Sequence, residues 1–236
     1  MLQEHCTAVV SSSNLDELKQ ALLDFTACMG FRTVSAVVVQ PHIAVGFQYL
    51  TIDNRPSGYD AIYFHEADAR RDPVLKHLRT RGVPLIWDKD TYSHAGCSDL
   101  WDKQAAYGYQ SGIATALHLP RARHFLLGLD SDSGLPNEAK RMTEMIADLQ
   151  LFAVHMQEAM TRILDGPDKV VNPNLTAREK EALHWTMAGK TAWEVSQILG
   201  ISQRTATEHT KNAMNKLQCN SKHQAVLKAL RLGLIE

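Results

Sequence analysis

Residues 175–233 contain three helix start signals in close succession, and this spacing most constrains what the chain can fold into. Thr176, Thr191 and Ser202 are small polar residues whose side-chain oxygens can accept a hydrogen bond from an N–H group of the first helical turn. Glu179 and Glu194 follow the two threonines three residues later and complete two capping boxes. The sequence therefore predicts three short helices in succession.

The third of these helices follows a short turn and has one strongly polar side. Gly200 supplies the backbone conformation that ends the second helix, which gives a helix, a turn and a helix. Apolar residues that can face inward are Ala206, Ala213, Met214 and Leu217. The rest of the surface is polar and basic, with Arg204, Thr205, Thr207, Lys211, Asn212 and Lys216. Such side chains suit the major groove of DNA, although a solvated helix of a small bundle is the alternative.

The same segment matches a recurring pattern. With x for positions left unspecified, it reads LTxREKExLxWxxxGKTxxEVxxILxISxRTxxxHxxNAMxKL. This run resembles the C-terminal DNA-binding domain of the LuxR family of transcriptional regulators, whose most recurrent residues fall on Glu179, Leu183 and Gly189. Ala206 departs from the family, which usually has a valine there, and this change leaves the polar side of the helix intact.

The resemblance implies roles for individual residues. Thr207 and Lys211 match positions from which the family reaches bases, and they are expected to carry sequence choice. Residues at or beside helix starts are expected mainly to hold phosphates: Trp185, Lys190, Thr191 and Arg204. Ser202, Thr205 and Glu208 complete the candidate DNA-binding set.

Charge is distributed unevenly along the 236 residues, although the formal net charge is only −1. Residues 171–236 hold nine Lys and Arg against five Asp and Glu, a net +4, and the remainder holds 16 against 21, a net −5. A modestly basic C-terminal unit beside an acidic N-terminal one fits a phosphate-binding unit carried by a sensor or assembly domain. The four cysteines stand far apart, which indicates neither a zinc site nor a disulfide framework.

In the N-terminal region, hydrophobic residues recur at helical spacing in some segments and cluster as in strands in others. Helical spacing or cap signals predict helices at residues 13–30, 59–69, 72–80, 98–107 and 137–164. Runs of β-branched and aromatic residues predict strands at residues 33–39, 43–52, 84–87, 112–119 and 123–130. The expected fold class is α+β: an N-terminal α/β/α sandwich around an antiparallel sheet, then an all-α four-helix helix-turn-helix domain. The expected boundaries are a ligand-binding and dimerisation domain at 1–164, a linker at 165–174 and the DNA-binding domain at 175–236.

The predicted helix 137–164 has a long apolar stripe rich in methionine. Part of this stripe must cover the sheet, and the remainder, including Met156 and Met160, leaves apolar surface that a second copy can bury. The helix is therefore expected to form a homodimer, and the alternative is that it is only core.

Candidate residues for binding a small molecule in the N-terminal domain lie between residues 55 and 112. Tyr59 and Tyr63 are four residues apart and share one helical face, Asp72 offers a carboxylate, and Trp87 and Trp101 offer flat apolar walls with an indole N–H each. These residues suit an apolar pocket with a few converging polar groups. The alternatives are that Asp72 only caps a helix and that Trp87 is core.

Here too the resemblance is informative. LuxR-type sensors of acyl-homoserine lactones have the pattern YPxxWxxxY, then DP, W and G, and this chain agrees at Tyr63, Asp72, Pro73, Trp87 and Gly112. Tyr59 stands in place of the tryptophan and Arg55 in place of the first tyrosine. The resemblance implies that Asp72 binds an amide N–H, that Trp87 packs on the ligand head and that Tyr63 lies along the chain.

These two departures affect which ligand is expected. Tyr59 makes the polar end roomier and provides a phenol hydroxyl, so we expect a hydrophobic-tailed ligand held by Asp72 and Tyr59, with ordinary lactones bound weakly. Arg55 would favour a carboxylate, an enolate or several carbonyls if it points inward, and is a solvated arginine otherwise.

The chain is therefore interpreted as a homodimeric, ligand-responsive transcriptional regulator that binds a double-stranded DNA operator. No enzyme is expected, because AGKT at 188–191 lacks the strand and glycine of a phosphate loop, and no cofactor is indicated. Without a signal peptide or an apolar segment of membrane-spanning length, a cytoplasmic protein is expected. Two alternatives stay open: an anti-activator that pairs with a related regulator, and a DNA binder that needs no ligand.

Overall fold

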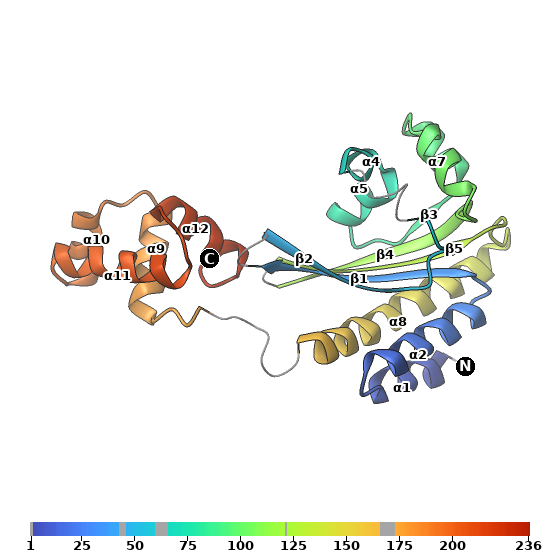
Figure 1. Ribbon diagram of the computed structural model, residues 1–236, viewed down its shortest axis with the longest axis horizontal. Helices are drawn as coiled ribbons and strands as arrows, with labels where there is room; N and C mark the ends of the chain where they lie inside the picture. The colour runs from blue at the N-terminus through green and yellow to red at the C-terminus, as the bar shows by residue number, and fades with distance from the viewer. Residues whose placement is uncertain (1, 43–45, 60–65, 121, 166–172) are drawn as a thin grey trace. The chain divides into compact units, whose positions relative to one another are not determined.

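The computed structural model describes residues 2–42, 46–59, 66–120, 122–165 and 173–236, and the chain divides into two compact units. The N-terminal unit is built on a five-stranded sheet and the C-terminal unit is helical (Figure 1). The predicted fold class is confirmed. Most of the predicted linker, residues 166–172, lies outside the described residues.

The sheet of the N-terminal unit has the strand order β2-β1-β5-β4-β3. Its strands are β1 (Thr33–His42), β2 (Gly46–Asp53), β3 (Leu85–Trp87), β4 (Ser111–Leu119) and β5 (Arg123–Ser131). β1 pairs antiparallel with β5, from Thr33 opposite Asp130 to Val39 opposite His124, and β3 pairs antiparallel with β4. β5 is the middle strand, so a polar residue on it lies deep in the unit.

Side chains of β5 alternate between the two faces of the sheet, because successive strand residues point in opposite directions. Phe125, Leu127 and Leu129 join the larger core, whereas Leu126 packs against the smaller one. The larger core includes residues of α1 (Leu2–Ser11), α2 (Leu15–Cys28) and α8 (Ala139–Asp165). The smaller includes residues of α5 (Pro73–Thr80), α6 (Lys89–His94) and α7 (Ser98–Ala105).

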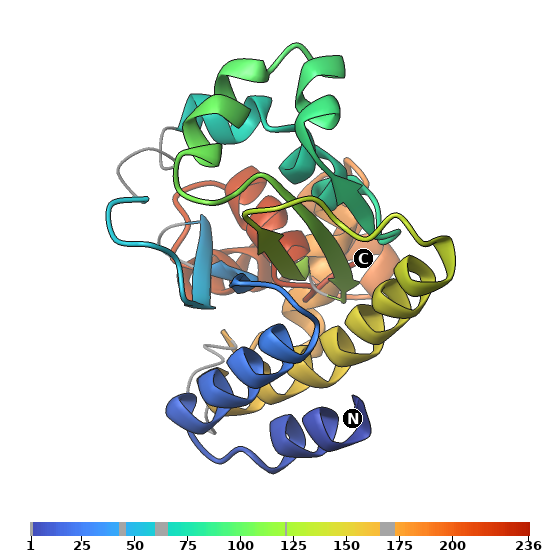
Figure 2. The same ribbon diagram turned by 90° about the vertical axis from the view of Figure 1, so that its right-hand side faces the viewer.

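Helices cover the sheet on both faces. Figures 1 and 2 show α1, α2 and α8 on one face and α5 and α7 on the other, together with α4 (Glu66–Arg71). The expected α/β/α layering is therefore present. The face that carries α4 to α7 is the one toward which the even-numbered residues of β5 point, including Asp130.

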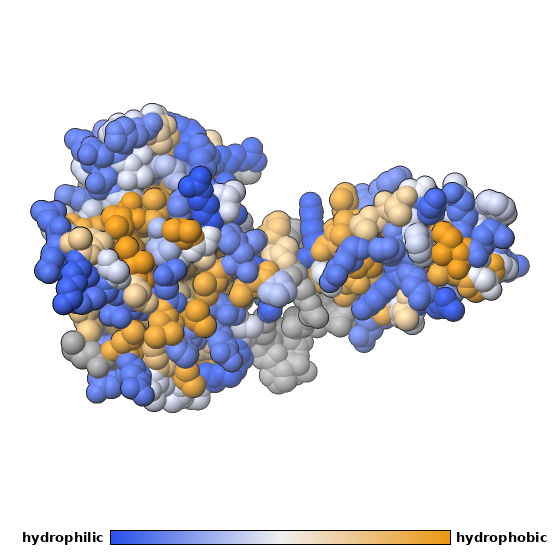
Figure 3. Space-filling model, turned by 180° about the vertical axis from the view of Figure 1, so that it is seen from behind, coloured by the Kyte–Doolittle hydropathy of each residue, from blue (hydrophilic) through white to orange (hydrophobic). Residues whose placement is uncertain are grey.

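The long helix α8 is mostly core. Met156 and Met160 are fully buried against α1, α2 and the sheet, so their assignment to a dimer surface was wrong. Helical spacing could not say which part of the stripe the sheet would cover. Among the described side chains of α8, the large apolar ones that face solvent are Leu151, 49% exposed, and Val154, 47% exposed. Figure 3 shows apolar side chains on the surface of both units.

The C-terminal unit consists of α9 (Ala177–Met187), α10 (Ala192–Leu199), α11 (Gln203–Lys216) and α12 (Lys222–Arg231). Both predicted capping boxes form, at Thr176 with Glu179 and at Thr191 with Glu194, and Ser202 caps α11. Gly200 ends α10 in the left-handed conformation, with φ +65°, which only glycine adopts without strain. The predicted helix, turn and helix is therefore present.

Some local predictions differ from the structure. α1 and α6 were not predicted: α1 buries only Cys6 and Val9, and the capping box of α6 uses Thr91 where a glutamate is usual. Tyr59 lies in a turn, not in a helix; residues 60–65 of the predicted helix lie outside the described residues, and α4 (Glu66–Arg71) covers its last part. β1 continues through its proline to residue 42, so the break expected there is absent.

Candidate functional site

Tyr59 lies in an aromatic cluster on the α4–α7 face of the sheet. Its ring stacks on Tyr109, with centroids 4.3 Å apart and planes 16° apart, and meets the edge of Tyr107 at 5.8 Å. Burial, followed by the nearby negative charge of Asp130, raises the pKa of Tyr59 well above its ordinary value. The phenol therefore stays protonated at neutral pH and keeps a hydrogen to donate.

Trp87 and Gly112 lie directly opposite each other on β3 and β4. A Cβ atom at Gly112 would lie 2.5 Å from the Leu129 carbonyl oxygen and 2.6 Å from Nε1 of Trp87. No side chain fits in that space, so the glycine allows the buried Trp87 ring to pack directly against the sheet. Both residues match the family pattern, and this close approach gives a steric reason for a glycine at position 112.

Asp72 is buried and has two roles. One carboxylate oxygen accepts the Leu75 N–H at 2.9 Å, which is the predicted cap of α5. The other accepts a hydrogen bond from the Tyr92 hydroxyl at 3.2 Å. The same hydroxyl lies 3.4 Å from Oε1 of Gln104. Capping therefore occupies only one side of the Asp72 carboxylate, and the other side takes part in a buried polar cluster.

Asp130 is a second buried carboxyl, and sequence reasoning missed it. It is 8% exposed, and burial and the negative charge of Asp72 raise its pKa to about 8. Tyr92 and Gln104 were missed as well. An isolated aspartate inside a strand that reads as apolar, as in the LLGLDS run, was the available signal. We call Asp72, Tyr92, Gln104 and Asp130 the head-group cluster.

The other predicted ligand residues lie differently. Both Nε and one terminal nitrogen of Arg55 lie 2.7 Å from Oδ2 of Asp53, so its charge is compensated by that neighbour. Trp101 donates its indole N–H to the Gln110 carbonyl at 3.0 Å and carries the Lys89 ammonium 5.0 Å from its ring. Tyr63 lies outside the described residues.

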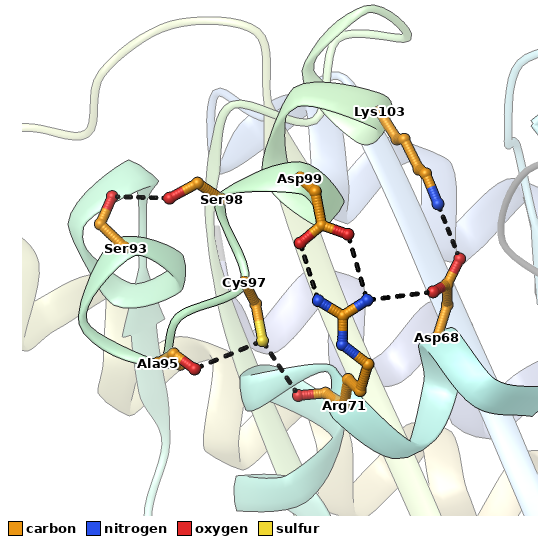
Figure 4. Close-up of polar contacts among 8 residues, drawn as sticks. All are labelled: Asp68, Arg71, Ser93, Ala95, Cys97, Ser98, Asp99 and Lys103. Atoms are coloured by element: carbon orange, nitrogen blue, oxygen red, sulfur yellow. Dashed lines mark hydrogen bonds and ion pairs between the residues drawn. The ribbon is translucent and has the colours of Figure 1, made fainter.

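An exposed ion-pair network joins the helices on this face (Figure 4). Arg71 of α4 contacts Asp99 of α7 through two hydrogen bonds, at 2.8 and 3.1 Å. Asp68 of α4 accepts from Lys103 of α7 at 2.9 Å and lies 3.7 Å from Arg71. The network holds α4 against α7, and both helices lie on the same face of the sheet as the head-group cluster.

The C-terminal unit presents one face of α11 to solvent. A shallow hollow along it is lined by Gln203, Arg204, Thr207, Glu208 and Lys211. In the described part of the chain, neither the Arg204 nor the Lys211 side chain has a hydrogen bond or an ion pair, so both cations are available to an anionic partner. The opposite side of α11 buries Ala206, Ala213 and Leu217, as the sequence predicted.

The remaining predicted DNA-binding residues lie at helix starts or beside them, except Trp185, which lies near the end of α9. The hydroxyl of Ser202 accepts the Thr205 N–H at 3.1 Å, and Thr191 caps α10. Lys190 lies 3.5 Å from Glu194, and Trp185 lines a separate hollow between α9, the end of α10 and the C-terminal residues. Trp193, 58% exposed near the start of α10, was not predicted.

An ion pair between the buried Glu179 and the exposed Lys216 helps to fix the position of α11. Lys216 donates to Glu179 at 2.8 Å and to the Asn174 carbonyl at 3.1 Å, so it does not belong to the free polar face. Burial alone would raise the pKa of Glu179, but hydrogen bonds from Lys216 and the Thr176 N–H outweigh it and lower the pKa. α11 is thereby anchored at its C-terminal end to the start of α9.

Comparison with known proteins assigns both units. Residues 14–160 match the family described as "Autoinducer binding domain", and residues 173–229 match "Bacterial regulatory proteins, luxR family". The chain belongs to the LuxR family. The predicted ligand-responsive, DNA-binding transcriptional regulator is confirmed at this level.

Relatives within the LuxR family extend over most of the chain. The transcriptional activator protein AnoR of Acinetobacter nosocomialis is 26% identical over 230 residues, which cover 97% of this chain and 96% of AnoR. The quorum sensing-dependent transcriptional regulator RpaR of Rhodopseudomonas palustris is 31% identical over 203 residues, covering 83% and 79% of the two chains. These relatives are transcriptional regulators, which agrees with the expectation that the chain is not an enzyme.

Solved LuxR-family structures share the architecture. The crystal structure of SdiA from Escherichia coli aligns with a TM-score of 0.81 at 25% identity over 99% of this chain and 97% of that one. SdiA in complex with octanoyl-rac-glycerol aligns with a TM-score of 0.80 at 24% identity, covering 99% and 94%. Among the described residues, none of the helices is long and apolar enough to cross a membrane.

Proposed function

We propose that this LuxR-family protein acts in the cytoplasm as a homodimer that binds a palindromic DNA operator in response to a hydrophobic-tailed small molecule. The observation that carries this proposal is the free cationic face of α11, where Arg204 and Lys211 flank Thr207 without ion pairs among the described residues. Lys211 and Thr207 would contact base edges, and Arg204 would hold a phosphate. Ser202, Thr205 and Glu208 lie on or beside this face and would complete the contact.

For the signal, we propose a site beside the head-group cluster, between the sheet and α4–α7. Trp87, which packs against Gly112, would form an apolar wall of the site. Tyr59 and Asp72 would bind the polar end of the ligand. SdiA has been solved with octanoyl-rac-glycerol, an acyl chain on a small polar head, which supports a ligand of this general shape. Arg55 and Trp101 would contribute at the margin, because both already have partners.

The dimer is proposed to form through the solvent-facing side of α8. Leu151 and Val154 are three residues apart, hence on one helical face, and both are about half exposed. Two copies would place two α11 helices on half-sites roughly one helical turn of DNA apart. Replacing both residues with glutamate should yield monomers in light scattering and weaken operator binding. Gln150→Glu is the control for added charge, since it places one glutamate at another exposed position of α8.

The proposed function is tested by DNA binding with and without ligand. Purified full-length protein is titrated onto a palindromic operator selected from random duplexes, with and without a series of acyl compounds. Ligand-dependent binding of two protomers per duplex supports the proposal. Binding only in the presence of a related regulator would support an anti-activator instead.

The stack of Tyr59 on Tyr109 favours a second candidate, a regulator that needs no ligand, because these rings fill part of the site themselves. In that case operator binding would be equally tight without any acyl compound. A ligand that binds only the folded state must raise the melting temperature, so thermal shifts distinguish the two candidates independently of DNA.

A further inference from the structure

The head-group cluster contains two buried carboxyl groups, those of Asp72 and Asp130. Among the described residues, no cation forms an ion pair with Asp130. Asp130 is 8% exposed, and its carboxyl group has no hydrogen bond or ion pair to any described residue. It lies close enough to Asp72 that the charge of Asp72 raises its pKa, and both carboxylates raise the pKa of the buried Tyr92. An isolated buried charge is costly, so this site requires either a proton or a positive partner.

Aromatic rings surround the same carboxylates. Tyr59 stacks on Tyr109, and Trp87 meets the edge of Tyr92 with centroids 5.9 Å apart. The negative charges of Asp130 and Asp72 both raise the pKa values of Tyr59 and Tyr92. Aromatic faces attract cations through the ring quadrupole, and the attraction is larger where water is excluded. Rings together with carboxylates are the environment in which proteins bind ammonium groups.

Gln104 adds an unpartnered donor to this environment. The residue is 4% exposed, and its Nε2 is buried with no hydrogen-bond partner in the described structure. Its Oε1 lies 3.4 Å from the Tyr92 hydroxyl, so the amide group is at the cluster. Tyr92 has a single hydroxyl hydrogen for both Asp72 and Gln104. The cluster therefore lacks a donor for Asp130 and an acceptor for Gln104 Nε2, and a ligand head could provide both.

We propose that the site takes a ligand whose head group carries a positively charged amine beside a carbonyl or hydroxyl oxygen. The ammonium lies between Asp130 and Asp72 against the aromatic rings, and the oxygen accepts from Gln104 Nε2. This inference rests on the proposed function, because it names the chemical class of the signal for that site. A neutral homoserine lactone has no cation to offer and would leave Asp130 protonated.

The test compares three compounds with the same eight-carbon acyl chain. N-(2-aminoethyl)octanamide has an ammonium head that, like that of lysine, stays charged at pH 7. N-(2-hydroxyethyl)octanamide replaces the ammonium with a hydroxyl, and N-octanoyl homoserine lactone is the neutral lactone. Binding to the full-length protein is measured by calorimetry and by thermal shift. We expect the ammonium compound to bind at least about tenfold more tightly than the hydroxyl compound, as a charge-assisted hydrogen bond allows.

Variants assign the preference to Asp130. Asp130→Asn should abolish the preference for the ammonium, and Asp130→Ser provides a second, smaller neutral replacement. The matched control is Asp132→Asn, two residues further along, where the aspartate is exposed and paired with Arg32 at 2.8 Å. The control should keep the full preference.

Failure of this inference differs from failure of the proposed function. If the lactone or the hydroxyl compound binds as tightly as the ammonium compound, the cationic head is wrong while ligand sensing stands. If the ammonium preference exists but Asp130→Asn keeps it, the placement of the ammonium at Asp130 is wrong. If none of the three compounds binds the folded protein, the proposed ligand site is wrong and the inference falls with it.

Discussion

The polar groups of the head-group cluster and those of α11 are in opposite situations. In the cluster, the Tyr92 hydroxyl contacts Asp72 and Gln104, whereas the Asp130 carboxyl and Gln104 Nε2 are buried without a hydrogen-bond partner among the described residues. On α11, Arg204 and Lys211 face solvent with no partner among the described residues. A buried polar atom without a partner is costly, whereas an exposed one is satisfied by water.

This difference determines what each region can recognise. Buried groups that are out of reach of water discriminate strongly, because a wrong ligand leaves one of them unpaired. Exposed cations attract any polyanion, and selectivity comes only from the few side chains that reach base edges. Changes in the cluster should therefore affect stability and ligand choice together, and changes on α11 should affect DNA binding without affecting stability.

The largest effect is expected at Gly112. A Cβ atom there would lie 2.5 Å from the Leu129 backbone and 2.6 Å from Trp87, so Gly112→Ala should cost about 3 kcal/mol of unfolding free energy, the upper part of the range for overpacking. Urea denaturation followed by circular dichroism measures this cost. Gly134→Ala, where nothing lies within 4 Å, should stay within about 0.5 kcal/mol. Equal stability of the two variants would mean that the Trp87 wall is not closely packed.

The next effect concerns Lys211. Lys211→Ala should weaken binding to the selected operator by about 1–3 kcal/mol and relax selectivity at one base pair in each half-site. Stability should be unchanged, because the side chain has no described partner. Fluorescence anisotropy at fixed salt, with operators mutated one base pair at a time, measures both quantities.

Lys222→Ala is the control for Lys211, since it removes the same charge from the exposed start of α12. A loss that is equal for every DNA sequence would remove Lys211 from base reading. The result would then place it with the residues that hold phosphates.

The sequence could predict α11 and its surroundings far better than the head-group cluster. Caps, the Gly200 turn and the apolar spacing of α11 are local features, so Thr176, Thr191 and Ser202 located the helices correctly. The cluster joins α5, α6, α7 and β5, which are far apart in the chain. Strand pairing and helix packing bring these residues together, and no local pattern links Asp130 to Asp72.

The errors have the same origin. Met156 and Met160 were assigned to a dimer surface because spacing shows that a stripe is apolar, but not how much of it the sheet covers. Tyr59 was assigned to a helix because four-residue spacing fitted, yet its ring is fixed by stacking on Tyr109 across the fold. Tertiary contacts decided both cases.

An effect of opposite sign, on stability, is expected at Asp130. Its folded-state pKa of about 8 lies above the ordinary value near 3.9, so the folded state binds the proton more tightly than the unfolded state. The stability that this proton contributes is fully present below pH 4 and is lost as the pH rises through about 8. Asp130→Asn should therefore stabilise the ligand-free protein at pH 8.5 by about 1–3 kcal/mol and have little effect at pH 4.

Neighbouring groups do not produce this pH dependence. Tyr59 and Tyr92, whose pKa values burial raises, stay protonated over the whole range. Denaturation curves at five pH values measure the difference, with Asp132→Asn as the control. Parallel pH profiles for wild type and Asp130→Asn would show that Asp130 is not protonated in the folded protein.

The smallest effect is expected at the ion pair between α4 and α7. Asp99 and Arg71 are about half exposed, and the hydrogen bond from Arg71 is the main reason that the pKa of Asp99 is lowered. Exposed pairs are screened by salt, with a Debye length of about 3 Å at 1 M. Asp99→Asn should therefore lower the melting temperature slightly at low salt and not at 1 M salt. Asp102→Asn removes a charge from the same helix without breaking a described contact, and it should have no such salt dependence. If Asp99→Asn instead weakens ligand binding at both salt concentrations, the network must fix the helices that cover the head-group cluster. These exposed polar groups would then contribute to ligand binding together with the buried ones.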